Sequence, residues 1–306
     1  MVAGMDFEVV ASGLNFPEGP VAMQDGSIIL VEIASGDITR VWGQDKREVI
    51  AHTGGGPNGA AIGPDGALYI CNNGGFEWSE MAGIKVPGHA PEDYSGGRIE
   101  RVDLKTGEVT RLYEKVGGNL LKGPNDIVFD KQGNFYFTDH GKTYPRHRDL
   151  GGLFYASPDG NMVKELDWGH TSPNGVGLSP DEKTVYMADT LTGRLWAYDL
   201  SAPGEVAPNN PLQRGRVVAT MPDLQYFDSL AVTAAGNICV ATIFNGGITT
   251  IKPDGAHYHT AFPDLLCTNI VFGGEDMQDA WVTMSGTGVL AKRRWDEPGL
   301  KLNYNG

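Results

Sequence analysis

The sequence predicts an all-β fold, a six-bladed β-propeller, from three observations. One motif occurs six times along the chain, helix signals are nearly absent, and glycine is in excess. Repeats of about 40 to 55 residues that each hold roughly four short strands are typical of propeller blades. We therefore expect residues 1–306 to form one domain of six blades.

Tight turns account for the glycine content. The chain has 43 glycines in 306 residues and no collagen-like period, against a usual glycine share of ~7%. Gly or Pro interrupts almost every window that would carry a helical period of about 3.6 residues. The alternative for a chain of this length, a (β/α)₈ barrel, needs eight helices of about ten residues or more, for which the sequence has no room.

The six copies of the motif follow one pattern. A polar residue precedes a short apolar run, a Gly/Asp-rich turn and a second apolar run, as in FPEGPVAMQDGSIILVEI. The copies begin at Phe16, Gly56, Gly123, Ser172, Tyr226 and Cys267. A third stretch follows each of the first five copies and alternates polar with apolar residues, which is typical of a half-exposed antiparallel strand.

Two segments fall outside this pattern. MDFEVVASGL, before the first motif, looks like a strand, and we expect it to supply the outer strand of the last blade, so that the ring has no open sheet edge. The second repeat is lengthened by the Pro- and Gly-rich insertion Gly74–Gly97. This insertion either covers one end of the ring or is a tolerated surface loop.

Charge and cysteine usage restrict the partners. The net charge of −14 argues against nucleic acid or an anionic membrane as partner, because both would be repelled. The three cysteines lie far apart, which fits a reducing compartment better than a disulfide framework or a zinc site. Without a signal-peptide pattern or a long apolar run, we expect a cytoplasmic protein. No obligate protein partner is evident.

One polar position recurs in every motif, just before the predicted inner strand. Its occupants are Glu18, Asn58, Asn125, Asn174, Asp228 and Asn269. Because inner strands line the central channel of a propeller, we expect these six side chains to converge at one end of it. Two carboxylates and four amides offer only oxygen, which suits Ca²⁺ first and Mg²⁺ or Mn²⁺ next. The alternative is that these Asn and Asp side chains only hydrogen-bond to the backbone of turns. That role would account for a polar residue in one repeat, but it does not require one in all six.

At these residues the chain resembles the regucalcin, gluconolactonase and luciferin-regenerating-enzyme family of six-bladed propellers. The similarity covers essentially the whole chain and is carried, in order, by FPEGP, GPNDIVFDKQGNFYFTD, SPNGVGLSPDEKTVYMADT and YFDSLAV. Some regucalcin-like members have an arginine two residues before the asparagine that matches Asn125. This chain has Gly123 there, so it looks closer to the bacterial gluconolactonase branch.

The resemblance implies one divalent metal on the propeller axis and the hydrolysis of a sugar lactone to the aldonic acid, a reaction of carbohydrate metabolism. The metal would be held by residues that match Glu18, Asn174 and Asp228, and Asn125 would bind the metal or the substrate beside it. Ca²⁺ is the first expectation, and Mn²⁺, Mg²⁺ and Zn²⁺ are the alternatives.

Lactone hydrolysis needs an attacking water and relief of the charge that grows on the carbonyl oxygen. A cation supplies that relief as a Lewis acid, and a nearby carboxylate takes the proton from water. We assign Asp228 as metal ligand and general base, and Glu18 as ligand only; the residue types alone also allow the reverse assignment of the base. The substrate contacts that we expect are Asn58, Asn125, Thr138 and His140.

Other functions stay open. A calcium-dependent hydrolase of organophosphates or of other lactones would need the same polarised P=O or C=O group and a nearby carboxylate. A non-catalytic propeller that serves as a binding platform is a third possibility. Such a platform has no need for two acids and four amides at one channel mouth.

Overall fold

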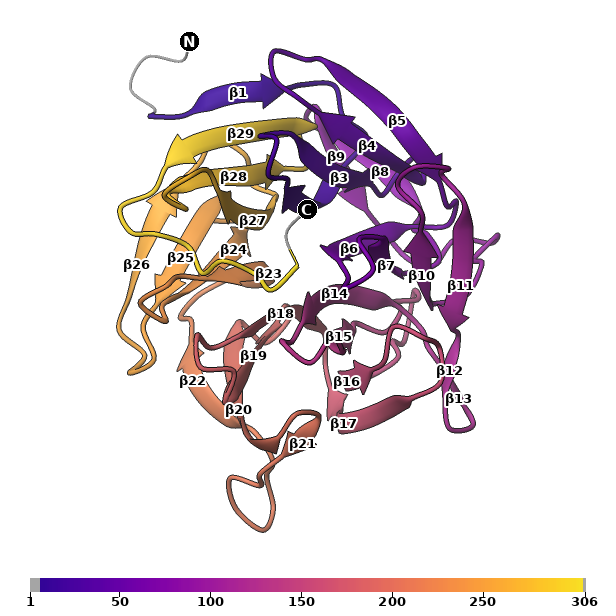
Figure 1. Cartoon of the computed structure of the whole chain (residues 1–306), viewed down its shortest axis with the longest axis vertical. Coiled ribbons are helices and arrows are strands. Elements are labelled where there is room, and N and C mark those ends of the chain that lie inside the picture. Colours follow the sequence, from indigo (N-terminus) through magenta and orange to yellow (C-terminus); the bar gives the residue numbers. More distant parts are fainter. Residues whose placement is uncertain (1–5, 305–306) are drawn as a thin grey trace.

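The computed structural model describes residues 6–304, and every regular element in this range is a β-strand. Six antiparallel sheets stand around a central axis (Figure 1). The predicted six-bladed propeller is therefore confirmed. Over the same residues the structure contains no helix that could span a membrane.

Each of these six sheets is one blade, and in the first five the first strand in sequence is the innermost. Blade 1 consists of β2 (Pro17–Ala22), β3 (Ile28–Glu32), β4 (Asp37–Val41) and β5 (Arg47–His52), and blade 2 of β6 (Pro57–Ile62), β7 (Leu68–Asn72), β10 (Arg98–Val102) and β11 (Val109–Tyr113). Blade 3 consists of β14 (Pro124–Phe129), β15 (Phe135–Asp139), β16 (Gly151–Ala156) and β17 (Val163–His170).

The second half of the chain repeats this order. Blade 4 consists of β18 (Pro173–Leu178), β19 (Thr184–Asp189), β20 (Arg194–Ala202) and β22 (Arg216–Thr220), with the short β21 (Glu205–Val206) also paired to β20. Blade 5 consists of β23 (Tyr226–Val232), β24 (Ile238–Ile243), β25 (Gly247–Ile251) and β26 (His257–Ala261). The motif copies thus begin at, or one residue before, the six inner strands.

The last blade is built from both ends of the chain. It contains β27 (Cys267–Gly273), β28 (Asp279–Met284) and β29 (Val289–Arg294), and its outer strand is β1 (Glu8–Ala11), antiparallel to β29. The predicted closure by the N-terminal segment is confirmed. Met5, where the predicted segment begins, lies outside the described residues.

A β-bulge interrupts each inner strand next to the recurring polar residue. The register shifts between Glu18 and Val21 in β2, and the same irregularity occurs near the start of β6, β14, β18, β23 and β27. The expectation that these polar residues precede the strands is therefore wrong, because they lie within them. A bulge twists the strand locally and re-aims the side chain beside it, which lets a strand residue point along the channel.

Glycines beside the bulges allow the inner strands to meet closely at the axis. A Cβ atom at Gly19 would lie 2.3 Å from the carbonyl oxygen of Asn58, and one at Gly59 would lie 2.5 Å from that of Asn125. No side chain fits at such distances. The Glu-Gly and Asn-Gly pairs of the motif therefore combine a polar group at the axis with a neighbour that leaves room for the next blade.

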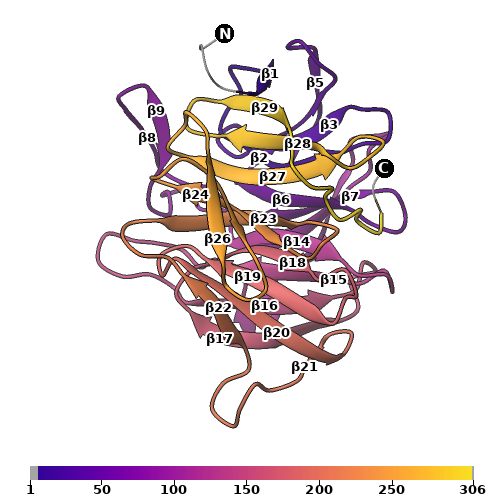
Figure 2. The same cartoon turned by 90° about the vertical axis from the view of Figure 1, so that its left-hand side faces the viewer.

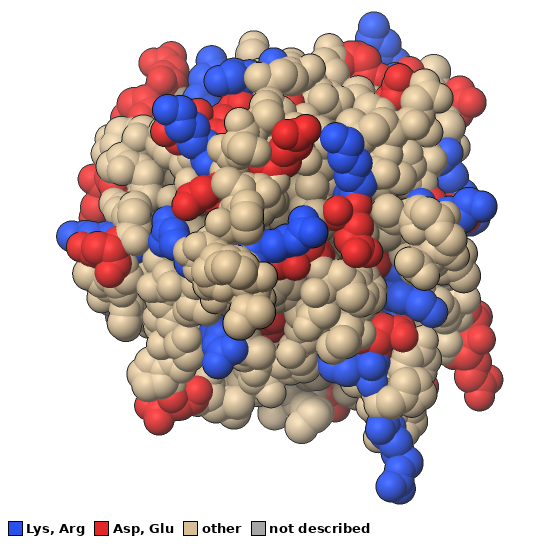
Figure 3. Space-filling view, turned by 90° about the horizontal axis from the view of Figure 1, so that it is seen from below, with Lys and Arg blue, Asp and Glu red and all other residues tan. Residues whose placement is uncertain are grey.

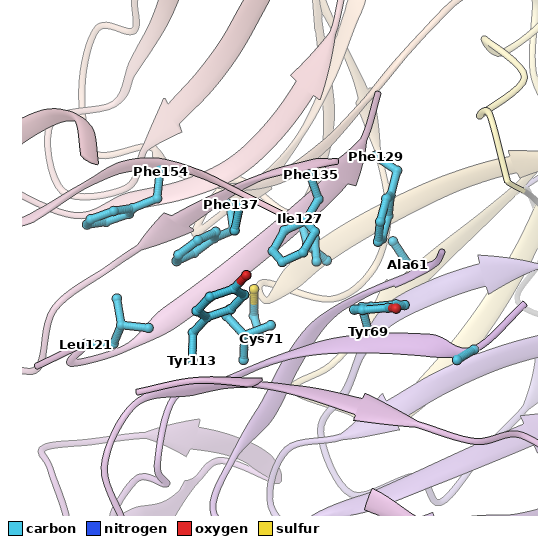
Figure 4. Close-up of a cluster of buried hydrophobic side chains, with 13 residues drawn as sticks. Ala61, Tyr69, Cys71, Tyr113, Leu121, Ile127, Phe129, Phe135, Phe137 and Phe154 are labelled. Carbon is cyan, nitrogen blue, oxygen red and sulfur yellow. The ribbon is translucent and has the colours of Figure 1, made fainter. Parts of the chain in front are cut away.

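Apolar side chains fill the spaces between blades. Figure 4 shows the cluster between blades 2 and 3, where Phe137 stacks on Phe154 with ring centroids 5.0 Å apart and Tyr69 meets Phe129 edge to face. A fully buried aromatic side chain contributes about 1.5–3 kcal/mol. The three cysteines are free thiols inside such layers.

The two mouths of the channel are covered by different segments (Figure 2). On one face stands a hairpin of β8 (Trp78–Met81) and β9 (Ile84–Pro87), which belongs to the insertion. On the opposite face the C-terminal segment crosses the channel, and residues 300–303 line a second cavity there. A further short hairpin, β12 (Lys115–Val116) and β13 (Asn119–Leu120), follows blade 2. Basic and acidic side chains alternate over the surface in Figure 3.

Candidate functional site

A cavity of ≈ 350 Å³ opens on the face that carries the β8–β9 hairpin. Five of the six equivalent polar residues line it, namely Glu18, Asn58, Asn125, Asn174 and Asp228. Each comes from a different blade, at the bulge of its inner strand. The structure therefore brings together the residues that the sequence predicts to converge, at the floor of a cavity large enough for a small molecule.

Asn269, the sixth equivalent residue, has a different position. Its amide nitrogen donates to Glu18 Oε2 at 2.7 Å, and its amide oxygen accepts from the backbone N–H of Ile270 at 2.8 Å. The amide is therefore occupied and does not line the cavity. Because Gly19 N–H also donates to Glu18 Oε2, one carboxylate oxygen of Glu18 is fixed. The other, Oε1, is buried without a hydrogen-bond partner.

Asn125, Asn174 and Asp228 form the opposite side of the floor. Asn125 Oδ1 is buried and has no hydrogen-bond partner. Asn174 Nδ2 donates to Thr190 Oγ1 at 3.0 Å, which turns its Oδ1 away from that threonine. Asp228 accepts hydrogen bonds from the Asn174 side chain and from the Ser229 backbone, and part of its surface stays open to the cavity. These residues leave oxygen atoms available at the floor.

A third acid, Asp126, lies beneath this floor and was missed in the sequence. It follows Asn125 and accepts hydrogen bonds from the backbone N–H groups of Ile127 at 2.9 Å and Val176 at 3.2 Å. The second bond ties blade 3 to blade 4. The sequence did contain a signal for Asp126, because no other motif has an acid at this position. Three of the other five motifs have glycine there, and the remaining two have Ser229 and Ile270.

Burial raises the pKa values of all three carboxyl groups, and charge repulsion adds to the rise for Asp126 and Asp228. Burial is the largest cause for each; the charge of Glu18 adds to it for Asp126, whose pKa rises to about 7, and for Asp228, whose pKa rises well above its usual value. Hydrogen bonds from Asn269 and Gly19 offset part of the rise in the pKa of Glu18. Within residues 6–304 none of these three carboxyl groups has an ion-pair partner.

The floor fits a hard divalent cation. Glu18 Oε1 and Asn125 Oδ1 are buried acceptors without partners, and the carboxylates beside them repel one another. Such a cation binds oxygen ligands and offsets two negative charges. Within residues 6–304 no group of three or more His, Cys, Asp or Glu side chains is placed to hold a metal, so amide oxygens from Asn125 and Asn174 would have to complete the set.

The predicted substrate contacts differ in position. Asn58 and His140 line the cavity. His140 Nδ1 is buried and has no partner, and burial lowers the pKa of the imidazole to about 3, so the ring is neutral. Thr138 does not line the cavity, because it is fully buried and its hydroxyl bonds to the Asn174 carbonyl oxygen. Its geometry does not support a substrate contact; it supports blade 4 instead.

The insertion covers the cavity as a roof. Phe76, Pro87, Gly88 and His89 line the cavity above the polar floor, and apolar residues of the blades complete the walls. Of the two alternatives for Gly74–Gly97, a cover or a tolerated loop, the structure therefore has the cover.

Contacts to three blades hold this roof in place. Lys142, a fully buried lysine of blade 3, donates from Nζ to the Gly75 carbonyl oxygen and lies 3.8 Å from the centre of the Phe76 ring. On the far side, Lys85 N–H donates to the Gly286 carbonyl oxygen at 2.9 Å, and Trp78 packs on Phe16 of blade 1. The roof is thus part of the folded cavity.

The loop after β15 also explains the glycine at position 123. A Cβ atom there would lie 2.6 Å from the carbonyl oxygen of Gly141. The loop occupies the space that any longer side chain at this position would need, so polar groups on this side of the cavity come from the loop itself.

Comparison with known proteins gives consistent results. The family model described as SMP-30/Gluconolactonase/LRE-like region matches residues 16–286. A gluconolactonase of Zymomonas mobilis is 27% identical over 277 residues, which cover 81% of this chain and 70% of that protein.

Two solved structures share the fold. A gluconolactonase from Xanthomonas campestris has a TM-score of 0.72 at 20% identity, over 94% of this chain and 88% of that chain. A calcium-binding protein, regucalcin, from Agrobacterium tumefaciens has a TM-score of 0.70 at 18% identity, over 97% of this chain and 98% of that chain.

Proposed function

Because the chain belongs to the SMP-30/gluconolactonase/LRE-like family, we propose that it is a lactonase that hydrolyses a sugar lactone of the gluconolactone type to the aldonic acid. The relative from Zymomonas mobilis and the structural neighbour from Xanthomonas campestris, both gluconolactonases, support this assignment. The observation that carries it is the floor of the cavity, where Glu18, Asn125, Asn174 and Asp228 present oxygen atoms beside an enclosed space of ≈ 350 Å³.

These four residues would hold one divalent cation. Calcium is the first candidate, supported by the oxygen-only donor set and by the calcium-binding structural neighbour. Mn²⁺, Mg²⁺ and Zn²⁺ are the alternatives. When bound, the cation would polarise the lactone carbonyl as a Lewis acid, an effect worth several kcal/mol in reactions of this kind.

Asp228 is the proposed general base. Its carboxylate is partly open to the cavity, so a water molecule can reach it, whereas one oxygen of Glu18 is fixed by Asn269 and Gly19. Asp228 takes a proton as the water oxygen bonds to the carbonyl carbon. The ring C–O bond then breaks, protonated Asp228 gives this proton to the leaving alkoxide oxygen, and the product is a hydroxy acid with the Asp228 carboxylate restored. Base catalysis of this type contributes about 10²–10⁴ in rate.

The remaining polar groups position the lactone. Asn58 and neutral His140 can hydrogen-bond to ring hydroxyls, and the apolar roof limits access of bulk water. Thr138 acts indirectly, through its bond to the Asn174 carbonyl oxygen. We also propose a reducing, cytoplasmic location, which three buried free thiols support.

The test is hydrolysis of glucono-1,5-lactone, followed by proton release after subtraction of the spontaneous rate. Chelator-treated protein is assayed alone and with added Ca²⁺, Mn²⁺, Mg²⁺ or Zn²⁺. We expect activity to be lost on chelation and restored by at least one cation. Asp228→Asn should lower kcat by about 10²–10⁴, while Asp254→Asn, at an exposed turn of the same blade, should not change it.

Two results would contradict the proposal. One is hydrolysis that survives chelation unchanged, and the other is an Asp228→Asn variant as active as Asp254→Asn. Stoichiometric binding of a cation without hydrolysis of the lactone would retain the site and refute the proposed substrate.

A further inference from the structure

Arg148 brings a positive charge to the wall of the cavity. It belongs to the loop between β15 and β16 and lines the same cavity as Glu18 and Asp228. Among the lining residues in the described part of the chain there is no lysine and no second arginine. Because arginine stays protonated in proteins, this wall carries a permanent cation.

The guanidinium is held in place without being neutralised. Nη2 donates to the carbonyl oxygen of His140 at 2.7 Å, and Nε donates to that of Asp149 at 3.3 Å. Both acceptors are uncharged. Asp189 and Asp149 act on the guanidinium electrostatically, but between residues 6 and 304 no carboxylate forms an ion pair with it. The backbone of Arg148 is also fixed, since it bridges to Thr143.

This arrangement leaves donors for a ligand. A guanidinium has five N–H groups in a planar fork that matches a carboxylate, and the backbone carbonyls accept from only two of its nitrogens. A partly buried arginine with spare donors that faces a cavity is suited to an anionic group of the molecule bound there.

The charges of the site favour the same conclusion. A divalent cation would offset two of the negative charges of Glu18, Asp126 and Asp228, and within the described residues none of these acids forms an ion pair with Arg148. The protein as a whole has a net charge of −14 and repels anions. An anionic substrate would therefore need a local cation on the wall, and a neutral lactone would not.

We propose that Arg148 is a specificity-determining residue that binds a carboxylate of the substrate, so that the preferred substrate is a lactone with a second, free carboxylic acid group. This inference rests on the proposed lactone hydrolysis and specifies its substrate class. When bound at the floor, a cation would polarise the lactone carbonyl, and Arg148 would hold the far end of the molecule.

The test compares two lactones with the same ring, glucaro-1,4-lactone and glucono-1,4-lactone, which differ in a carboxylate against a hydroxymethyl group. For the wild type with cation, we expect kcat/KM to be about tenfold or more higher for the acidic lactone, the scale of one charge-assisted hydrogen-bonded pair. Arg148→Met should reduce this preference by about tenfold or more. The matched control is Arg146→Met, an exposed arginine of the same loop, which should keep it.

Other results decide against the inference. A wild type that favours the neutral lactone would overturn it. An Arg148→Met variant that lowers both kcat/KM values equally would also overturn it, because an arginine that only holds the loop in place would affect both substrates. If Arg148→Met does not fold, Arg148→Lys keeps the charge but not the fork. It should lower the preference only in part, and an equal effect on both lactones would again overturn the inference.

Failure of the proposed function is distinguishable from failure of this inference. If neither lactone is hydrolysed with any cation, the proposed function is wrong, and calorimetry of glucarate binding to the Ca²⁺-treated protein decides the role of Arg148. Binding that Arg148→Met weakens about tenfold would support the carboxylate site. Equal binding by both proteins, or none by the wild type, would refute it.

Discussion

Asn269 and Glu18 belong to the two blades that meet where the ring closes, and one hydrogen bond of 2.7 Å joins their side chains at the channel floor. Asn269 offers its nitrogen to the carboxylate because its oxygen is already bonded to its own strand. Its role is therefore to orient Glu18, and it is not placed as a ligand itself.

Asn269→Ala should weaken cation binding by about 10–100-fold, the usual effect of removing a residue that orients a metal ligand. Calorimetric titration with Ca²⁺ measures this directly. Asn161→Ala, at an exposed turn, is the control and should bind as the wild type does. Unchanged affinity in Asn269→Ala would mean that Glu18 needs no orientation or is not a ligand.

Gly59 shows how closely the inner strands approach each other. A methyl group there would lie 2.5 Å from the Asn125 carbonyl oxygen and from the Cα atom of Asp126, whereas Gly118 has open space around it. Gly59→Ala should lower the free energy of unfolding by about 1–3 kcal/mol through overpacking, and Gly118→Ala should not. Urea unfolding curves compare them; an equal effect would contradict the close packing at the axis.

The sequence predicted where the site residues lie better than what each one does. Six equivalent positions could be read from the repeat, and five line one cavity. The role of Asn269 could not be read from the repeat, because it depends on the amide oxygen accepting a hydrogen bond from the backbone N–H of Ile270. Asp126 and Thr138 were misjudged for a related reason, since their partners belong to blade 4, and contacts between blades leave no local pattern.

At the level of elements, the insertion is a roof whose contacts with three blades include one buried lysine. Lys142 holds the Gly75 carbonyl oxygen and the Phe76 ring, and its Nζ also lies 3.2 Å from Asn73 Oδ1. The roof also meets the β15–β16 loop of blade 3 through Ala90 N–H, which donates to the Thr143 carbonyl oxygen at 2.9 Å. Lys142 therefore adds a buried side-chain anchor to this backbone bond.

Lys142→Met should loosen the roof without unfolding the blades. Hydrogen bonds to a charged group contribute about 1.5–3 kcal/mol, so the opening equilibrium should rise about 10–100-fold. Amide hydrogen exchange in residues 74–97 measures it, with exposed Lys131→Met as the control. Exchange that stays as slow as in the control would show that the backbone bonds suffice.

The same lysine predicts a dependence of stability on pH. Burial lowers its pKa to about 7, whereas an unfolded chain gives ~10.4. Between these values the unfolded state binds more protons, so stability rises with pH across this window, by less than about 1.4 kcal/mol per pH unit. Relative to Lys142→Met, the wild type should therefore gain unfolding free energy from pH 7 to 9. A constant difference in urea unfolding would contradict this.

The number and order of the blades followed from the sequence, but the start of each inner strand, the bulges and the path of the insertion did not. The alternation of apolar runs and turns sufficed to place six blades. The bulges could not be predicted, because they arise where six strands crowd one axis. The path of the insertion could not be predicted, because its anchors, Lys142 and Gly286, are distant from it in sequence. They contact the insertion only in the folded ring.

For the whole molecule, ring closure depends on one short strand. Val10 of β1 is 8% exposed and packs into the last blade, while its neighbour Val9 is 51% exposed. Val10→Asp should lower the unfolding free energy by about 3–5 kcal/mol, the cost of an unpaired buried charge, and Val9→Asp should have little effect. Thermal and urea unfolding of the pair test this, and equal costs would mean that β1 does not seal the ring.

The pairing of β1 with β29 also constrains how the protein is made. Among the strands of residues 6–304, β1 is synthesised first and its partner β29 last. At ~5–20 residues per second, the wait is on the order of tens of seconds, during which the nascent chain has a free strand at one end and an unfinished arc of blades at the other. The last blade, which combines β1 with β27, β28 and β29, can therefore be completed only after the strands of the other five blades have been synthesised.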